Sequence, residues 1–145
     1  MKNQDYHKGF ITSIPAGEAF KRISQVDQWW AANFTGSAAN LNDIFRVDFG
    51  KTWVTFKLTE VVKNEKYVWL VTDCYLDWLS NKTEWTGTKI LFQISADKDG
   101  TKVEMTHIGL VPGIECYDTC NNGWNNHFGN DLQQFMATGQ SIFAA

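Results

Sequence analysis

The chain is 145 residues long, with 43% hydrophobic and 14% aromatic residues, which predicts one domain, residues 1–145, with a substantial core. Its formal net charge of −3 and lack of any run of Lys and Arg argue against a protein whose main partner is nucleic acid. The longest apolar runs are much shorter than the roughly 18 residues that a membrane-spanning helix needs. The polar start MKNQDYHKG lacks the apolar stretch of a signal peptide, so we expect a soluble, cytoplasmic protein.

The beginning of the chain predicts a strand followed by two short helices. Residues 6–14 have alternating character and stop at Pro15, which cannot donate to a strand ladder but fits the first turn of a helix. We therefore expect a helix over residues 15–24 and a second short helix or turn over residues 26–32. A loop that contains Gly36 is expected to follow.

From residue 43 to about residue 110 the sequence is typical of successive β-strands. The run TWVTFKLTEVV alternates in character, and KYVWLVTDCYL and GTKILFQISA are rich in β-branched and aromatic residues. Turn signals separate these runs at residues 63–66, 79–82 and 97–100, the last being an Asp-Gly hairpin. The pattern predicts about five or six antiparallel strands.

After Pro112 and Gly113 the hydrophobic period becomes helical, and Gly139 is a natural C-terminal stop. We expect one long helix over residues 115–139 that lies across the concave face of the sheet, in an α+β layout. At roughly 100° per residue, one face of this helix collects most of its large apolar side chains. These residues are Tyr117, Trp124, Phe128 and Phe135, with Leu132 at the edge.

Two glycines, Gly123 and Gly129, lie inside this predicted helix, although each costs about 1 kcal/mol relative to alanine in a helix interior. The missing side chains could leave room for a ligand or a moving helix. They could instead allow a close approach between helix and sheet. Both explanations remain open from the sequence.

The segments GTKVEMTHIGL and NNGWNNHFGNDLQQFMATG resemble the closing hairpin strand and C-terminal helix of the SRPBCC, or START-like (Bet v 1-like), superfamily. The Trp29-Trp30 pair and the helix start at Pro15 agree with this resemblance, which is closest to homologues of the heat-shock-protein ATPase activator. The resemblance implies a helix-grip fold. In that fold a seven-stranded antiparallel sheet curls round a long C-terminal helix and leaves a cavity between them.

His107 is the most informative single polar residue. It shares its strand phase with Val103 and Met105, so its side chain is expected to face the cavity. It could be a core residue with satisfied hydrogen bonds, or a polar group that orients a mostly apolar ligand. General acid or base catalysis also stays open because the pKa of an ordinary histidine is near neutral, but the sequence assigns no carboxylate partner.

Cys116, Cys120 and His127 lie within about 40° of one another on the predicted helix. His127 is nevertheless about 10 Å along the axis from Cys120, too far to share one zinc ion with it. We therefore predict no metal site, and no cofactor. A disulfide between Cys116 and Cys120 is sterically conceivable but unusual within a helix, and the expected compartment disfavours it.

The sequence contains seven tryptophans, which could form a large aromatic core, line a cavity or make an exposed patch for a partner. Stacking on single-stranded nucleic acid is disfavoured because no cationic groove accompanies these aromatic residues. We predict binding of a small hydrophobic or aromatic ligand, such as a lipid, between the sheet and the C-terminal helix. The residues predicted to line the site are Met105, His107, Trp124, Phe128, Phe56, Trp69 and Phe92.

Two other functions remain open. An enzyme of the cyclase or hydrolase kind known in the superfamily would need two or three polar groups converging near His107. A chaperone-linked interaction protein, which would have a protein partner, would need an exposed apolar patch. The sequence favours a binding module over an enzyme, and it predicts neither the ligand nor the oligomeric state.

Overall fold

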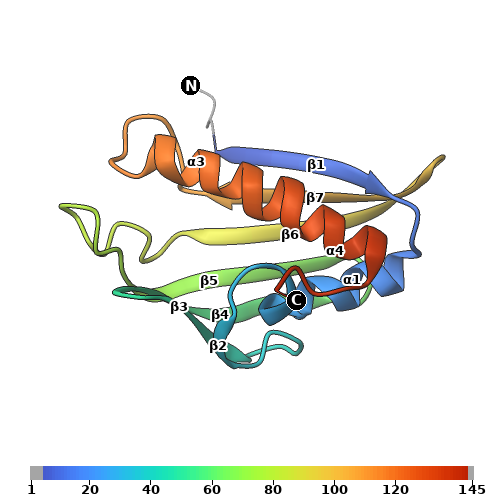
Figure 1. The fold of residues 1–145 in the computed structure, drawn as a ribbon, viewed down its shortest axis with the longest axis horizontal. Coiled ribbons are helices and arrows are strands. Elements are labelled where there is room, and N and C mark those ends of the chain that lie inside the picture. The colour runs from blue at the N-terminus through green and yellow to red at the C-terminus, as the bar shows by residue number, and fades with distance from the viewer. Residues whose placement is uncertain (1–4, 144–145) are drawn as a thin grey trace.

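The computed structural model describes residues 5–143, which form an antiparallel sheet with a long helix across one face and shorter helices beside it (Figure 1). The strands are β1 (Tyr6–Thr12), β2 (Asn33–Gly36), β3 (Ile44–Phe49), β4 (Thr52–Val62), β5 (Lys66–Tyr75), β6 (Lys89–Asp97) and β7 (Gly100–Ile108). The helices are α1 (Ala16–Ser24), α2 (Val26–Trp29), α3 (Tyr117–Asn126), the π-helical segment η1 (His127–Leu132) and α4 (Gln133–Thr138). Residues 1–4 and 144–145, the two ends of the predicted domain, lie outside the described part.

The described residues form a seven-stranded sheet in the order β1-β7-β6-β5-β4-β3-β2. Every neighbouring pair in this sheet is antiparallel. The first strand, β1, lies at one edge and pairs with the last strand, β7. The strand count is the one that the family resemblance implies. Five of the strands, β3 to β7, lie between residues 43 and 110, where the strand pattern predicted five or six. The predicted α+β helix-grip fold is confirmed.

Pro15 marks the change from strand to helix, as the sequence predicts. It caps α1 with φ −65° and ψ 157°, and its carbonyl oxygen accepts a hydrogen bond from the Ala19 N–H at 3.0 Å. Two elements are shorter than predicted. Strand β1 ends at Thr12 instead of residue 14, and helix α2 ends at Trp29 instead of residue 32.

Strand β2 lies in a segment that the sequence predicted to be a loop, and this prediction was wrong. The strand pairs with β3 from Asn33 opposite Asp48 to Gly36 opposite Phe45. Its four residues are exposed or half-buried, as at a short sheet edge, so they carry no alternation that would indicate a strand. Gly36 has φ 99°, and a Cβ atom there would collide with the carbonyl oxygen of Ile44. Glycine therefore permits the close approach of β2 to β3.

The long C-terminal helix is continuous from Tyr117 to Thr138, 22 residues, and confirms the prediction of one helix over this region. It ends where the sequence predicts, because Gly139 adopts φ 73° and donates its N–H to the Phe135 carbonyl at 2.8 Å. The segment η1 is one π-helical stretch in its middle, a feature that often occurs at functional sites. Over residues 5–143, no helix has both the length and the apolar character needed to cross a membrane.

The helix packs its apolar face on the sheet. The Phe128 ring lies 5.1 Å from the Phe10 ring of β1 and 6.2 Å from the Phe92 ring of β6. Gly129 faces Lys8 of β1, whose Cε would be 2.6 Å from an added Cβ atom. Gly129 thus makes room for the Lys8 side chain of β1, which is nearer to the second explanation for the helix glycines, packing between helix and sheet.

The middle of the sheet's helix-bearing face is filled by aromatic side chains centred on Trp69, which is fully buried. Its ring centroid lies 4.6 Å from Phe92, 4.9 Å from Phe45 and 5.5 Å from Phe56. Such aromatic pairs each contribute about 0.5–1.5 kcal/mol beyond their buried area. Part of the aromatic content therefore forms a solid core, and any cavity must lie away from it.

We expect Gly36→Ala to lower the free energy of unfolding by about 2 kcal/mol or more, because it adds both a disfavoured φ and a collision with Ile44. Gly50→Ala is the matched control, since Gly50 has φ 71° but no atom of the described residues lies within 4 Å of an added Cβ. The control should cost about 1 kcal/mol. Urea unfolding of both variants measures the difference, and equal losses would contradict the close β2–β3 approach.

Candidate functional site

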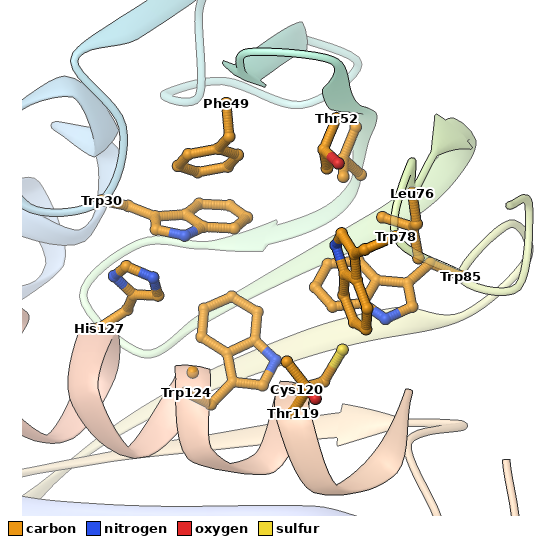
Figure 2. Close-up of a pocket in the computed structure, with 12 residues that line it drawn as sticks. Trp30, Phe49, Thr52, Leu76, Trp78, Trp85, Thr119, Cys120, Trp124 and His127 are labelled. Atoms are coloured by element: carbon orange, nitrogen blue, oxygen red, sulfur yellow. The ribbon is translucent and has the colours of Figure 1, made fainter. Parts of the chain in front are cut away.

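A pocket of about 300 Å³ lies at the α3 end of the long helix, beyond the aromatic core (Figure 2). This volume is at the lower end of the range of roughly 300–1,000 Å³ typical of small-molecule sites. Its walls come from the end of α2, the β3–β4 turn, the connection between β5 and β6 (here called the 76–88 loop) and the long helix. The lining residues are Trp30, Phe49, Thr52, Val54, Leu76, Trp78, Trp85, Thr119, Cys120, Gly123, Trp124 and His127.

Aromatic rings form most of the wall. Figure 2 shows Trp30 and Phe49 on one side, Trp78 and Trp85 on the opposite side, and Trp124 rising from the helix between them. Phe49 and Trp78 are 41% and 48% exposed, so they lie at the mouth, whereas the other three are buried. The pocket is therefore an apolar slot that opens to solvent on one side.

Gly123 lies in the helical wall of the pocket. Apart from its chain neighbours and the backbone of its own helix, no described residue has an atom within 4 Å of the place where its Cβ would be. The two helix glycines thus have different explanations: Gly129 allows close packing, whereas Gly123 leaves open space in the pocket.

His107 is completely buried behind the pocket and links two of its walls through hydrogen bonds. The indole Nε1–H of Trp124 lies 3.0 Å from His107 Nδ1, and His107 Nε2 lies 2.9 Å from the Thr88 hydroxyl. The Thr88 hydroxyl in turn donates to the carbonyl oxygen of Trp85 at 2.7 Å. These contacts form one chain from α3 through β7 to the 76–88 loop.

The direction of this chain fixes the protonation of His107. Trp124 Nε1–H can only donate, so Nδ1 of His107 must be the acceptor. The Thr88 proton is directed to Trp85, so the Thr88 oxygen accepts from His107 Nε2–H. This is the neutral Nε2–H tautomer, and burial lowers the pKa of His107 to about 3, which keeps it neutral. Both ring nitrogens are thus occupied, as in a core histidine with satisfied hydrogen bonds.

Three buried side-chain nitrogens in the described residues have no hydrogen-bond partner: Nε1 of Trp69, Nε1 of Trp85 and Nδ1 of His127. A buried donor or acceptor without a partner costs about 1–3 kcal/mol. Trp69 belongs to the closed core, whereas Trp85 and His127 line the pocket.

His127 contributes a neutral imidazole to the pocket wall. Burial lowers its pKa, and the nearby Asp131, with 3.5 Å between Nδ1 and Oδ2, acts in the opposite direction. Of the twelve described residues that line the pocket, none is Asp, Glu, Lys or Arg. The site therefore has no formal charge of its own near neutral pH.

Two carboxylates hold the 76–88 loop against the start of α3. Glu84 accepts the N–H groups of Glu115 and Cys116 at 2.9 and 2.8 Å. Glu115 accepts the N–H groups of Ser80 and Asn81 at 2.8 and 2.9 Å, and these backbone hydrogen bonds lower its pKa. Each segment thus supplies a carboxylate to the backbone of the other, which keeps the Trp78 and Trp85 wall in place.

The structure brings the side chains of Cys116 and Cys120 into direct contact, the pair for which the sequence analysis considered a disulfide. Cys116 precedes the first residue of α3 and the two Cα atoms are 5.5 Å apart, a separation that a disulfide can span. Within residues 5–143, no group of three His, Cys, Asp or Glu side chains could hold a metal ion. Cys120 and His127 line the pocket.

The structure places the predicted site residues in two groups. Trp124 lines the pocket, and His107 lies directly behind it. The others are fully buried in the adjoining core, and their part in binding stays a prediction; they are Met105, Phe128, Phe56, Trp69 and Phe92.

Sequence reasoning did not find most of the pocket wall. Trp30, Phe49, Thr52 and Thr119 come from segments whose relative positions no local pattern encodes. One usable signal was present: Trp78 and Trp85 lie in a polar connection between strands, where a core does not require tryptophan.

Solved structures share this fold over nearly the whole chain. The Aha1 dimer from Colwellia psychrerythraea matches with a TM-score of 0.72 and 21% identity, covering 96% of this chain and 98% of that chain. The chain therefore has the same fold as this protein. Aha1 is a heat-shock ATPase activator, so the structural neighbours include the kind of protein that the sequence resemblance indicated.

Two further neighbours extend the comparison. Protein SSP2350 from Staphylococcus saprophyticus has a TM-score of 0.72 and 14% identity, with 98% of both chains covered. DynU16, a protein in the dynemicin biosynthetic locus, has a TM-score of 0.70 and 14% identity, covering 97% of this chain and 49% of that one. Identities this low show the fold alone. No protein-family model matches the chain, and no curated protein matches it.

We expect His107 to make the protein less stable as the pH falls. In the unfolded chain His107 binds a proton below about pH 6.5, whereas in the folded chain it binds one only below about pH 3. The free energy of unfolding should therefore decrease through this window, by up to about 1.4 kcal/mol per pH unit from this group. His107→Gln retains a donor and an acceptor but does not titrate, so its urea-unfolding curve should lose this part of the slope. Parallel pH profiles for the two proteins would contradict the assignment.

Proposed function

We propose that this protein binds a small hydrophobic or aromatic molecule in the pocket between the 76–88 loop, the β3–β4 turn and α3. The observation that carries the proposal is Gly123, which keeps an aromatic-walled space open in the middle of a helix. A glycine inside a helix costs about 1 kcal/mol relative to alanine. Close packing offsets that cost at Gly129, but Gly123 faces open space, so access for a ligand is its best explanation.

The chemistry of the wall supports an apolar ligand. Trp30, Trp124 and Trp85 offer ring faces and edges that are already buried, so little ordering is needed on binding. Trp124 would contact the ligand directly, and His107 would hold its indole in place. The remaining predicted residues, Met105, Phe128, Phe56, Trp69 and Phe92, would form the rigid base behind the site.

Binding is favoured over catalysis by the state of His107. Its two nitrogens are engaged with Trp124 and Thr88, and its low pKa makes it a poor base near neutral pH. The neighbours DynU16 and Aha1 have the same fold, and the protein in a biosynthetic locus agrees with a role in handling small molecules. We propose this binding role for a single-domain cytoplasmic protein, as the sequence predicts.

The proposal can be tested with N-phenyl-1-naphthylamine, a neutral apolar dye that becomes fluorescent when it leaves water. The wild-type protein should bind the dye, and Gly123→Leu should weaken binding tenfold or more, because the new side chain fills the pocket. Gly123→Ala is the graded comparison: it adds one methyl group to the pocket, should weaken binding but by less than leucine does, and should raise stability by about 1 kcal/mol. A wild-type protein that does not bind the dye, or a Leu variant with unchanged affinity, would contradict the proposal.

A further inference from the structure

Cys116 and Cys120 lie one helical turn apart at the start of the long helix, and their side chains are in direct contact. The two Cα atoms are 5.5 Å apart, within the range of roughly 4.4–6.8 Å that a disulfide spans. The Cys120 N–H donates to the Cys116 carbonyl oxygen at 2.8 Å. Because this hydrogen bond closes the turn without help from the sulfurs, a disulfide can form or break here while the backbone keeps its path.

The two cysteines differ in their access to the pocket. Cys116 is fully buried, and its backbone N–H is held by Glu84 of the 76–88 loop at 2.8 Å. Cys120 is 7% exposed and lines the pocket, and Figure 2 shows its sulfur pointing away from the helix, toward the opposite wall. A small reagent that enters the pocket therefore reaches Cys120 first, and Cys116 lies behind it.

The third cysteine, Cys74, is separate from this pair. Its buried thiol contacts the Lys82 carbonyl oxygen at 3.8 Å and the Thr86 hydroxyl at 3.5 Å, and it is not among the residues that line the pocket. Disulfides of cytoplasmic proteins are usually transient and catalytic or redox-sensing. In the cytoplasmic protein that the sequence predicts, the contact between Cys116 and Cys120 therefore suits a reversible bond.

We propose that Cys116 and Cys120 form a reversible disulfide, which exchanges with small-molecule disulfides and whose state sets the ligand affinity of the pocket. In the oxidation, the Cys120 thiolate attacks one sulfur of the small disulfide and releases one thiol. The Cys116 thiolate then attacks the Cys120 sulfur of this mixed disulfide and releases the second thiol. Two electrons and two protons pass from the protein dithiol to the small disulfide, which becomes two thiols.

The redox state changes the room in the pocket. Sulfurs that are not bonded lie much farther apart than bonded sulfurs, so reduction must separate the pair. Cys116 is enclosed and its backbone is held by Glu84, whereas Cys120 borders open space. The Cys120 sulfur is therefore the one that moves, into room that a ligand uses in the oxidised form. This effect on affinity rests on the proposed binding function, whereas the disulfide itself does not.

Redox buffers of 2-mercaptoethanol and its disulfide, bis(2-hydroxyethyl) disulfide, test the proposal on the full chain. Both reagents are small and uncharged, like the wall of the pocket. Protein from each buffer is quenched with acid and alkylated in urea with N-ethylmaleimide. Mass spectrometry should find all three cysteines alkylated in the reducing buffer and only Cys74 in the oxidising buffer. Peptide mapping should place the bond between Cys116 and Cys120.

The oxidised and reduced wild-type proteins should differ in their affinity for N-phenyl-1-naphthylamine. The reduced form should bind about fourfold more weakly, the loss expected when the pocket gives up room for one methylene-sized group. Cys116→Ser cannot form the pair, so its affinity should be the same in both buffers. Cys74→Ser is the matched control, because it removes the other thiol and should keep the wild-type response. Thermal unfolding checks that both variants fold.

The disulfide and the binding function can fail separately. Three alkylated cysteines in both buffers would overturn the disulfide, and a pair that stays oxidised in excess 2-mercaptoethanol would overturn its reversibility. Equal dye affinities of the two wild-type forms would overturn the control of the pocket and leave the proposed function intact. If neither form binds the dye, the proposed function and the control of affinity both fail, while the alkylation result still decides the disulfide.

Discussion

The hydrogen-bond chain through His107 is the constraint on which the pocket depends. A buried imidazole must have both nitrogens satisfied, and here one partner is Trp124 on the helix while the other is Thr88 at the end of the 76–88 loop. The same chain continues to the backbone of Trp85. Two walls that are far apart in the sequence are therefore positioned by one residue of β7. The helix and the loop cannot shift independently without leaving a buried polar group unpaired.

The location of the pocket follows from how completely the rest of the helix-bearing face is filled. Trp69 and its aromatic neighbours occupy the centre, so the remaining space lies at the α3 end, where loops replace strands. Loops are ordinarily the mobile parts of a fold. Here the carboxylates of Glu84 and Glu115 accept backbone N–H groups between the 76–88 loop and the start of α3. These hydrogen bonds hold the loop wall in place. The result is a site with a rigid base and a loop wall that hydrogen bonds tie both to the start of α3 and, through Thr88, to β7.

The sequence predicts those parts of this structure that local physics encodes. Pro15 and Gly139 mark helix boundaries, and alternation identifies strands such as β7, so His107 was placed on the correct face of the sheet. The short edge strand β2 has no such pattern and was missed. Most of the pocket wall was missed for a different reason. Phase shows which way Met105 points but not whether that space is already filled, and filling depends on side chains such as Trp69 from other strands.

The pairing of β1 with β7 also has a consequence for how the chain folds. Tyr6 lies opposite His107, so the first strand finds its partner only after nearly all of the sheet has been made. At synthesis rates of roughly 5–20 residues per second, β1 waits on the order of 10 s on the ribosome. Contacts between segments this distant in sequence also slow folding in solution. The long helix, which packs on β1 through Phe10, leaves the ribosome later still, so the helical wall of the pocket is the last of its walls to be synthesised.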